Sequence, residues 1–199
     1  MEHFTLQVGS FEVNATLLVR DARALIVDPG QDADRIVAAL EEHHLTPEAI
    51  LLTHGHFDHI NAIPGLLARY PGLRVLVSEE DAKVMSHPLN TYPPEYEPVA
   101  CATERPDATV AEWGGTVVPT PGHTPGGCCY YFPAERLLLS GDTLFAGSVG
   151  RTDLPGGDMA TLMRSLESLR TLPGDTTVIP GHGPFTTIAA ELAGNPFLL

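Results

Sequence analysis

The stretch from Thr53 to His59 constrains this chain most, because it places His54, His56, Asp58 and His59 within six residues. It directly follows a four-residue apolar run that is typical of a short buried strand. Alternate side chains of an extended segment share a face, so the first two histidines can point the same way. Imidazole and carboxylate suit zinc, iron or manganese, and four such groups exceed what one metal usually takes from so short a segment. We therefore expect two adjacent metals, with the first two histidines on one and the last two residues on the other.

Three later segments repeat one pattern, in which a strand ends and a glycine-containing turn carries a residue of metal-ligand type. Those residues are His123, Asp142 and His182. Glycine and proline fix a turn sharply enough to aim a single side chain. Each turn is weak evidence alone, but with the central stretch they supply five histidines and two aspartates. The other histidines lack this context and are expected on the surface: His3, His43, His44 and His87.

The overall composition argues against several classes of protein. A chain of 199 residues is most simply one domain, 1–199, long enough to bury a core. It has neither a secretory signal pattern nor an apolar run that could span a membrane, so we expect a cytoplasmic protein. Its net charge of −14 argues against a nucleic-acid partner, which needs clustered Lys and Arg. The three cysteines form no paired framework, which suits a reducing compartment, and they are interpreted as packing residues.

Hydrophobic periodicity and turn signals predict an α/β chain. Strands are expected near 4–8, 15–19, 24–27, 49–52, 74–77, 116–119, 127–132, 136–140 and 176–179. Helices are expected over 32–44 with Asp32 as the cap, 61–70, from Ser78 onward, 158–172 and 187–193. Strands interleaved with helices, without strict βαβ alternation, indicate two sheets with helices outside them.

Residues 87–107 interrupt this regularity with five prolines. So long an irregular segment is often functional and could border a substrate cleft. The other interpretation is a surface excursion without a role of its own. The sequence leaves both interpretations open.

The order of the motifs resembles the metallo-β-lactamase superfamily: His-X-His-X-Asp-His, then Gly-His, Gly-Asp and a final Gly-His. The resemblance implies an α/β (α+β) fold, a four-layer αβ/βα sandwich of two mixed β-sheets with helices on the outer faces. The ligands it implies are His54, His56 and His123 for one metal, Asp58, His59 and His182 for the other, and Asp142 as the bridge. Asp28 matches an aspartate that orients the ligands. The cofactors would be two divalent metal ions, zinc first, with iron or manganese as alternatives.

Within that superfamily, residues 144–153 and the ending Pro-Gly-His-Gly-Pro resemble the glyoxalase II-like hydrolases, in particular their short single-domain bacterial branch. The larger enzymes add a helical C-terminal domain that helps to hold glutathione, and we expect none here because only seventeen residues follow His182. Arg151 falls where those enzymes carry a basic glutathione contact, and we predict it to bind substrate; a plain surface charge is the alternative. Asp153 and Pro184 fall near positions where those enzymes use tyrosines.

The activity that the resemblance implies is metal-dependent hydrolysis of a small-molecule 2-hydroxyacyl thioester, such as S-lactoylglutathione, through a metal-bridging hydroxide. Asp58 would be both a ligand and the catalytic group that orients this nucleophile. No nucleic acid or membrane partner is expected, and the sequence does not indicate an oligomeric state.

Three rival functions remain. One is a persulfide dioxygenase with a single iron on His54, His123 and Asp142, although such enzymes resemble Pro-Ala-His-Asp where this chain has Pro-Gly-His-Gly. Another is hydrolysis of a lactone or β-lactam, which uses the same chemistry. The third is a non-enzymatic metal-binding module, which the lack of cysteine ligands disfavours.

Overall fold

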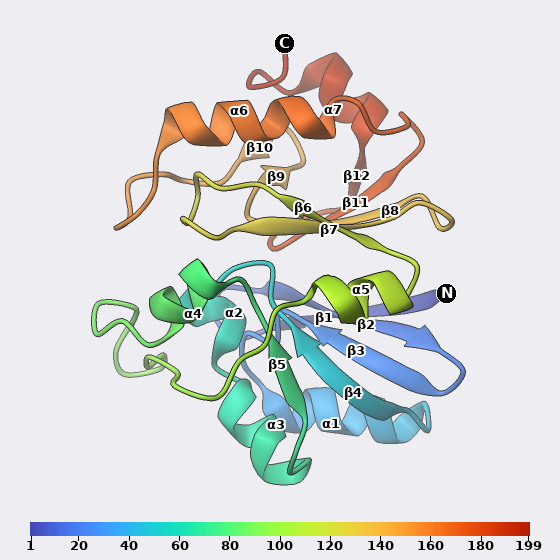
Figure 1. The fold of residues 1–199 in the computed structure, drawn as a ribbon, viewed down its shortest axis with the longest axis vertical. Helices are drawn as coiled ribbons and strands as arrows, with labels where there is room; N and C mark the ends of the chain where they lie inside the picture. Colours follow the sequence, from blue (N-terminus) through green and yellow to red (C-terminus); the bar gives the residue numbers. More distant parts are fainter. The chain divides into compact units, whose positions relative to one another are not determined.

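Each half of the chain is built on one five-stranded mixed sheet (Figure 1). The structure, a computed structural model, describes all residues from Met1 to Leu199. The chain divides into two units, Met1–Arg105 and Pro106–Leu199. None of the helices combines the length and the apolarity that crossing a bilayer requires.

The sheet of the first unit follows the order of the sequence. Its strands are β1 (Glu2–Val8), β2 (Val13–Arg20), β3 (Arg23–Val27), β4 (Thr46–Leu51) and β5 (Arg74–Leu76). The first three pair antiparallel through short turns, and β4 and β5 add in parallel after helical crossovers. The helices are α1 (Ala33–Glu42), α2 (Phe57–Ile60), α3 (Ile63–Arg69) and α4 (Glu79–Met85). Because β3 and β4 are parallel, their C-terminal ends meet at one edge, where ligands bind in α/β sheets.

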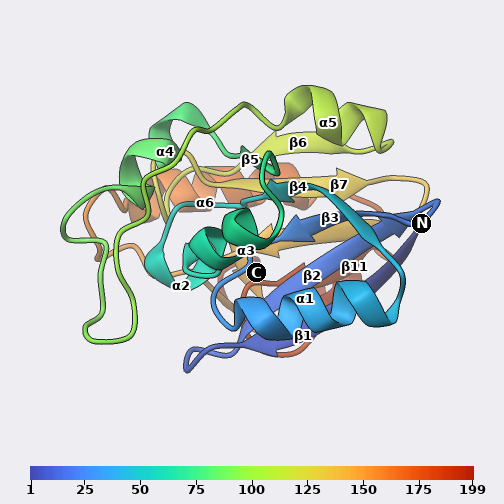
Figure 2. The ribbon, with the colours of Figure 1, turned by 90° about the horizontal axis from the view of Figure 1, so that it is seen from below.

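Helices α1 and α3 cover one face of this sheet (Figures 1 and 2). Ile36 and Leu40 of α1 are fully buried in the core of the unit, and each such burial contributes about 1.5–3 kcal/mol. Asp32 precedes α1 as predicted, but its side chain does not cap the helix. Its backbone is left-handed, with φ 56°, and its carboxylate accepts the N–H of Gly9 at 3.0 Å instead. Packing therefore holds α1 in place without the expected cap.

The second unit has a sheet in the order β12-β11-β8-β7-β6, with a separate two-stranded hairpin. The sheet strands are β6 (Thr116–Pro119), β7 (Cys128–Phe132), β8 (Leu137–Gly141), β11 (Thr177–Pro180) and β12 (Thr186–Thr187). The hairpin is β9 (Leu144–Phe145) and β10 (Ser148–Val149), and the helices are α5 (Asp107–Glu112), α6 (Met159–Leu169) and α7 (Ile188–Gly194). Helices α6 and α7 lie on one face of this sheet (Figure 1). Asp158 caps α6 by accepting the N–H of Thr161 at 2.7 Å.

The predicted α/β class with two mixed sheets and helices is confirmed. The helix predicted over 61–70 is confirmed as α3 (Ile63–Arg69). The four-residue helix α2, which carries Asp58 and His59, was not predicted. Neither were α5 and the short strands β9, β10 and β12, which have two to six residues and too little periodicity to register.

Candidate metal centre

The ligand stretch of the first unit brings its three histidine rings together. Ring centroids of His54 and His56 are 4.9 Å apart, and those of His54 and His59 are 4.1 Å apart. All three side chains are buried, and Asp58 on the first turn of α2 is half-buried. An irregular connection of five residues between β4 and α2 gathers side chains that a continuous strand would spread along its length.

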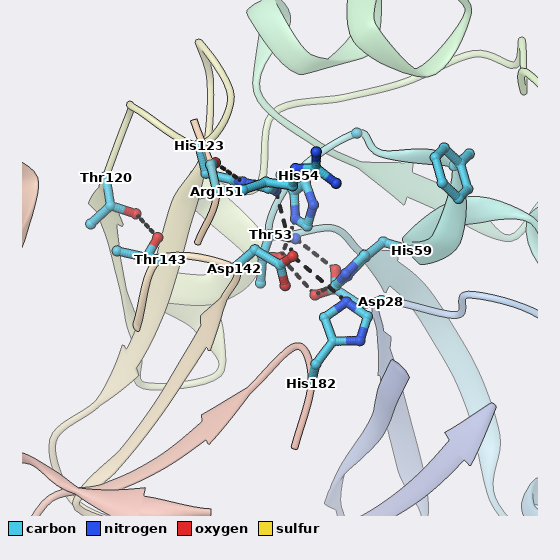
Figure 3. A network of polar contacts seen from close by, with 12 residues as sticks. Asp28, Thr53, His54, His59, Thr120, His123, Asp142, Thr143, Arg151 and His182 are labelled. Atoms are coloured by element: carbon cyan, nitrogen blue, oxygen red, sulfur yellow. Dashed lines mark hydrogen bonds and ion pairs between the residues drawn. The ribbon is translucent and has the colours of Figure 1, made fainter. Parts of the chain in front are cut away.

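Asp28, at the end of β3, braces this stretch from the neighbouring strand (Figure 3). Its Oδ1 accepts the N–H of Thr53 at 2.8 Å, and its Oδ2 accepts the Thr53 hydroxyl at 2.6 Å. The same Oδ2 lies 3.1 Å from Nδ1 of His59. A carboxylate this close to Nδ1 favours a proton on that nitrogen, which leaves Nε2 to bind a metal. The orienting role that the sequence suggested for Asp28 stays a prediction.

In the second unit, the three candidate ligands follow three strands of one sheet. Strands β8 and β11 pair in parallel, which sets the turns of Asp142 and His182 at the same sheet edge. Oδ2 of Asp142 lies 3.5 Å from Nε2 of His123 and 3.6 Å from Nε2 of His182 (Figure 3). These separations are long for hydrogen bonds, but two ligand atoms on one tetrahedral zinc stand about 3.4 Å apart. The spacing is that of groups that share an ion.

A backbone carbonyl group orients His123. Its Nδ1 lies 2.7 Å from the carbonyl oxygen of Arg151, so an Nδ1–H donates there and leaves Nε2 facing Asp142. The chain reaches this position through Gly150, where a Cβ would fall 1.8 Å from the carbonyl oxygen of Asp142. Gly150 was not predicted as part of the site, and the only signal for it was its position next to Arg151 in the sequence.

A buried hydroxyl pair lies next to Asp142 and was also missed. Thr120 directly follows β6, and its Oγ1 is 2.8 Å from Oγ1 of Thr143 (Figure 3). Both threonines are buried. The pair ties the turn that follows β8 to the one that follows β6, which are the turns of two candidate ligands. Nothing in the spacing of the two threonines could have indicated this contact.

The side chain of Arg151 is exposed and forms a two-point ion pair with Asp153. Nε donates to Oδ1 and Nη2 to Oδ2, each at 2.7 Å. The hydrogen bond from Arg151 lowers the pKa of Asp153 to about 2, and the same pair raises the pKa of Arg151. A substrate carboxylate at this guanidinium would therefore compete with Asp153. The prediction that Arg151 binds substrate stays a prediction.

The residues left out of the site lie where the sequence analysis placed them. His3, His43, His44 and His87 are exposed, and His43 stacks on Phe4 with ring centroids 4.3 Å apart. None of the three cysteines forms a disulfide, and Cys128 and Cys129 are buried. Burial raises the pKa of the Cys101 thiol, which makes the reactive thiolate scarcer.

The donor groups fit a divalent metal centre. All seven candidates offer an imidazole nitrogen or a carboxylate oxygen, the ligands that zinc, iron and manganese accept. The Nδ1 atoms of His59 and His123 face a carboxylate and a carbonyl, as is usual for histidines that bind metal through Nε2. Each unit thus presents a set of oriented donors.

Comparison with known proteins decides the family. Residues 8–182 match the family model of the metallo-beta-lactamase superfamily. The chain belongs to the metallo-β-lactamase superfamily. It is 37% identical over 203 residues to the probable metallo-hydrolase YqgX of Bacillus subtilis, covering 97% of this chain and 95% of that protein. It is also 34% identical over 204 residues to the hydroxyacylglutathione hydrolase GloC of Haemophilus influenzae, covering 97% and 96%.

Solved structures of the superfamily share the fold. TTHA1623, solved in a di-iron-bound form, superposes with a TM-score of 0.91 at 36% identity, covering 98% of this chain and all 100% of that one. The B3 metallo-beta-lactamase BLEG-1 superposes with a TM-score of 0.84 at 34% identity, covering 99% of both. The chain is thus a metallo-hydrolase of this superfamily, and its donor groups imply divalent metal ions. A di-iron relative leaves iron beside zinc as a candidate.

Proposed function

We propose that the protein hydrolyses a 2-hydroxyacyl thioester such as S-lactoylglutathione. The observation that carries this proposal is the 34% identity to a hydroxyacylglutathione hydrolase over nearly the full length of both chains. The donor chemistry of both units supports it, because histidine and carboxylate without cysteine is typical of hydrolytic metal sites and not of closed structural zinc sites.

The proposed centre holds two divalent ions, with zinc as the first candidate. The residues that would hold them are His54, His56 and His123 for one ion and Asp58, His59 and His182 for the other, with Asp142 available to both. When bound, such ions lower the pKa of a water molecule to about 7 and polarise a substrate carbonyl.

The roles of the chain's own residues follow from their chemistry. The Asp58 carboxylate accepts a hydrogen bond from the attacking water and orients it toward the acyl carbon. As the new C–O bond forms, the attacking water gives up a proton to solvent, and as the C–S bond breaks, the sulfur leaves with the electron pair. Thiols have a pKa near 8.5, so the thiolate is a good leaving group and takes its proton from solvent. The reaction therefore needs no separate general acid. Asp28 keeps His59 and Thr53 in place.

Substrate recognition in this proposal falls to Arg151. A carboxylate of the thiol carrier would displace Asp153 from the Arg151 guanidinium. This displacement costs little because the pair is exposed and exposed ion pairs are weak. We further propose that the protein works in the cytoplasm on this small molecule, without nucleic acid or membrane as partners. Three cysteines without a disulfide suit a reducing compartment.

The test is release of free thiol from S-lactoylglutathione by the metal-loaded protein. We expect turnover that a chelator abolishes and that added zinc, iron or manganese restores. Metal-loaded protein that releases no thiol from this or any other 2-hydroxyacyl thioester would refute the proposal.

Hydrolysis of β-lactams is the second candidate, because a B3 metallo-beta-lactamase shares the fold at 34% identity over 99% of the chain. A chromogenic cephalosporin assayed on the same preparation decides between the two. Oxygen uptake with glutathione persulfide tests the dioxygenase alternative, which we expect to be negative because the last motif reads Pro-Gly-His-Gly.

A further inference from the structure

The irregular segment 87–98 contacts the ligand stretch near its start and Asn61, the residue that follows α2, near its end. Toward its end, Nδ2 of Asn61 donates to the carbonyl oxygen of Glu97 at 2.9 Å. The N–H of Glu97 donates in return to Oδ1 of Asn61 at 3.1 Å. In Figures 1 and 2 the segment runs beside α2 and α4. It is therefore joined to the helix that carries Asp58 and His59.

Near the start of the segment, one buried amide joins the two halves of the ligand stretch. Nδ2 of Asn90 donates to the carbonyl oxygen of Gly55 at 2.9 Å, and Oδ1 of Asn90 accepts the N–H of Phe57 at 3.0 Å. Gly55 separates the first two candidate histidines, and Phe57 directly precedes Asp58. The Asn90 side chain is 6% exposed, so water competes little for these bonds.

The other polar group of Gly55 is held from α4. Oδ2 of Asp81, a fully buried carboxylate, accepts the N–H of Gly55 at 2.8 Å. A Cβ at Gly55 would come 2.5 Å from the carbonyl oxygen of Asp81, so the ligand stretch approaches α4 as closely as only glycine allows. The N–H and the carbonyl group of Gly55, which lies between His54 and His56, are thus both hydrogen-bonded to side chains from outside the stretch.

Contacts that do not involve Asn90 also hold the segment together. Rings of Phe11, Phe57, Tyr92 and Tyr96 pack against one another with centroids 5.2–6.0 Å apart. Within the segment, the Thr91 hydroxyl donates to the carbonyl oxygen of Tyr96 at 2.7 Å. These contacts hold the segment together, whereas two of the bonds of Asn90 go to the ligand stretch.

We propose that Asn90, assisted by Asp81, is a positioning residue that fixes the pair His54 and His56 relative to the pair Asp58 and His59, and thereby sets the metal affinity. The proposal rests on the ligand assignment under the proposed function, but not on the identity of the substrate. It assigns to the irregular segment 87–98 the role of supporting the ligand stretch.

The experiment is a titration of the metal-free protein with zinc in competition with a chromophoric chelator. Asn90→Ala removes both bonds to the stretch, and we expect zinc affinity to fall about 10–100-fold, the usual effect of losing a group that orients ligands. Asn90→Asp keeps the acceptor for Phe57 but cannot donate to Gly55, so it should weaken binding in the same direction. Asn90→Asp also decides the matter if Asn90→Ala does not fold.

Two matched controls separate positioning from general destabilisation. Thr91→Val removes a hydrogen bond inside the segment, and Ile36→Val trims the core beneath α1; both should lower the melting temperature without changing zinc affinity. For the second residue, Asp81→Asn retains an oxygen acceptor and should rescue the affinity that Asp81→Ala loses.

The inference is overturned if wild-type protein binds no zinc, if both Asn90 variants bind as tightly as wild type, or if the controls weaken binding equally. Wild-type protein that binds zinc tightly but hydrolyses no thioester would refute the proposed substrate alone. In that case weaker zinc binding by the Asn90 variants would still support the positioning role.

Discussion

The two units present their candidate ligands in different ways. In the first unit the ligands follow one another within the stretch His54–His59 and are braced by side chains, among them Asp28 and Asn90. In the second unit, where the ligands lie on three separate turns, His123 is oriented by the carbonyl of Arg151. In a contiguous stretch the candidate ligands are close in sequence, but side chains from other elements must hold the conformation of the stretch. Turns at one sheet edge are instead positioned by the paired strands that they follow.

The largest effect should come from substituting Asp142, the candidate ligand that lies near both candidate histidines of the second unit. Asp142→Ala removes the carboxylate that lies within 3.6 Å of both histidine Nε2 atoms, and it should lower kcat by at least about 10²–10³-fold. Turnover of S-lactoylglutathione and far-UV circular dichroism together show whether activity is lost from a folded chain. Asp175→Asn, at an exposed ion pair of the same unit, is the control and should leave activity unchanged. Near wild-type turnover by Asp142→Ala would contradict the assignment.

The side-chain bracing of the first unit is tested by Asp28→Asn. The substitution weakens the hold on Nδ1 of His59 and on Thr53, so metal affinity should fall about 10–100-fold. A chelator competition titration measures the change. Asp34→Asn, on the exposed first turn of α1, should bind metal like wild type. If Asp28→Asn binds metal normally, the first unit does not depend on side-chain bracing and the contrast between the units fails.

The backbone bracing of the second unit is tested by Gly150→Ala. The added Cβ would fall 1.8 Å from the Asp142 carbonyl oxygen, so the chain must shift, at a cost of about 1–3 kcal/mol of unfolding free energy. The shift also moves the Arg151 carbonyl, and we expect an about tenfold weaker metal affinity. Gly194→Ala, whose new Cβ would meet no atom of another part of the chain within 4 Å, should lower neither the unfolding free energy nor the metal affinity. Denaturant unfolding and metal titration check both, and an unperturbed Gly150→Ala would show that the turn tolerates repacking.

The same contrast explains what the sequence could predict. The ligand stretch was readable because its residues are adjacent, and the turns of Asp142 and His182 because glycine marks the ends of their strands. Most strands and long helices were also found, since their periodicity extends over several residues. Contacts such as Asn90 with Gly55, or Thr120 with Thr143, join residues far apart in the chain through ordinary polar side chains. No local pattern announces such partners, because only the folded chain brings them together.

The smallest effect is expected from Asp153→Asn, which removes the exposed ion pair between Arg151 and Asp153. The pKa of Asp153 is lowered to about 2 from an ordinary value of 3.8, so its ionised form is favoured by folding. The pair therefore stabilises the protein above pH 4, and this contribution disappears as pH falls from about 4 to about 2. The melting temperatures of wild type and variant should differ slightly at pH 7 and converge at pH 2.

In the Asp153→Asn variant, Arg151 should also bind a carboxylate-bearing thioester with a KM a few-fold lower, because Asp153 no longer competes for the guanidinium. An unchanged KM would mean that Arg151 serves the site through its backbone carbonyl alone, which would leave the second unit without any side-chain contribution from this position.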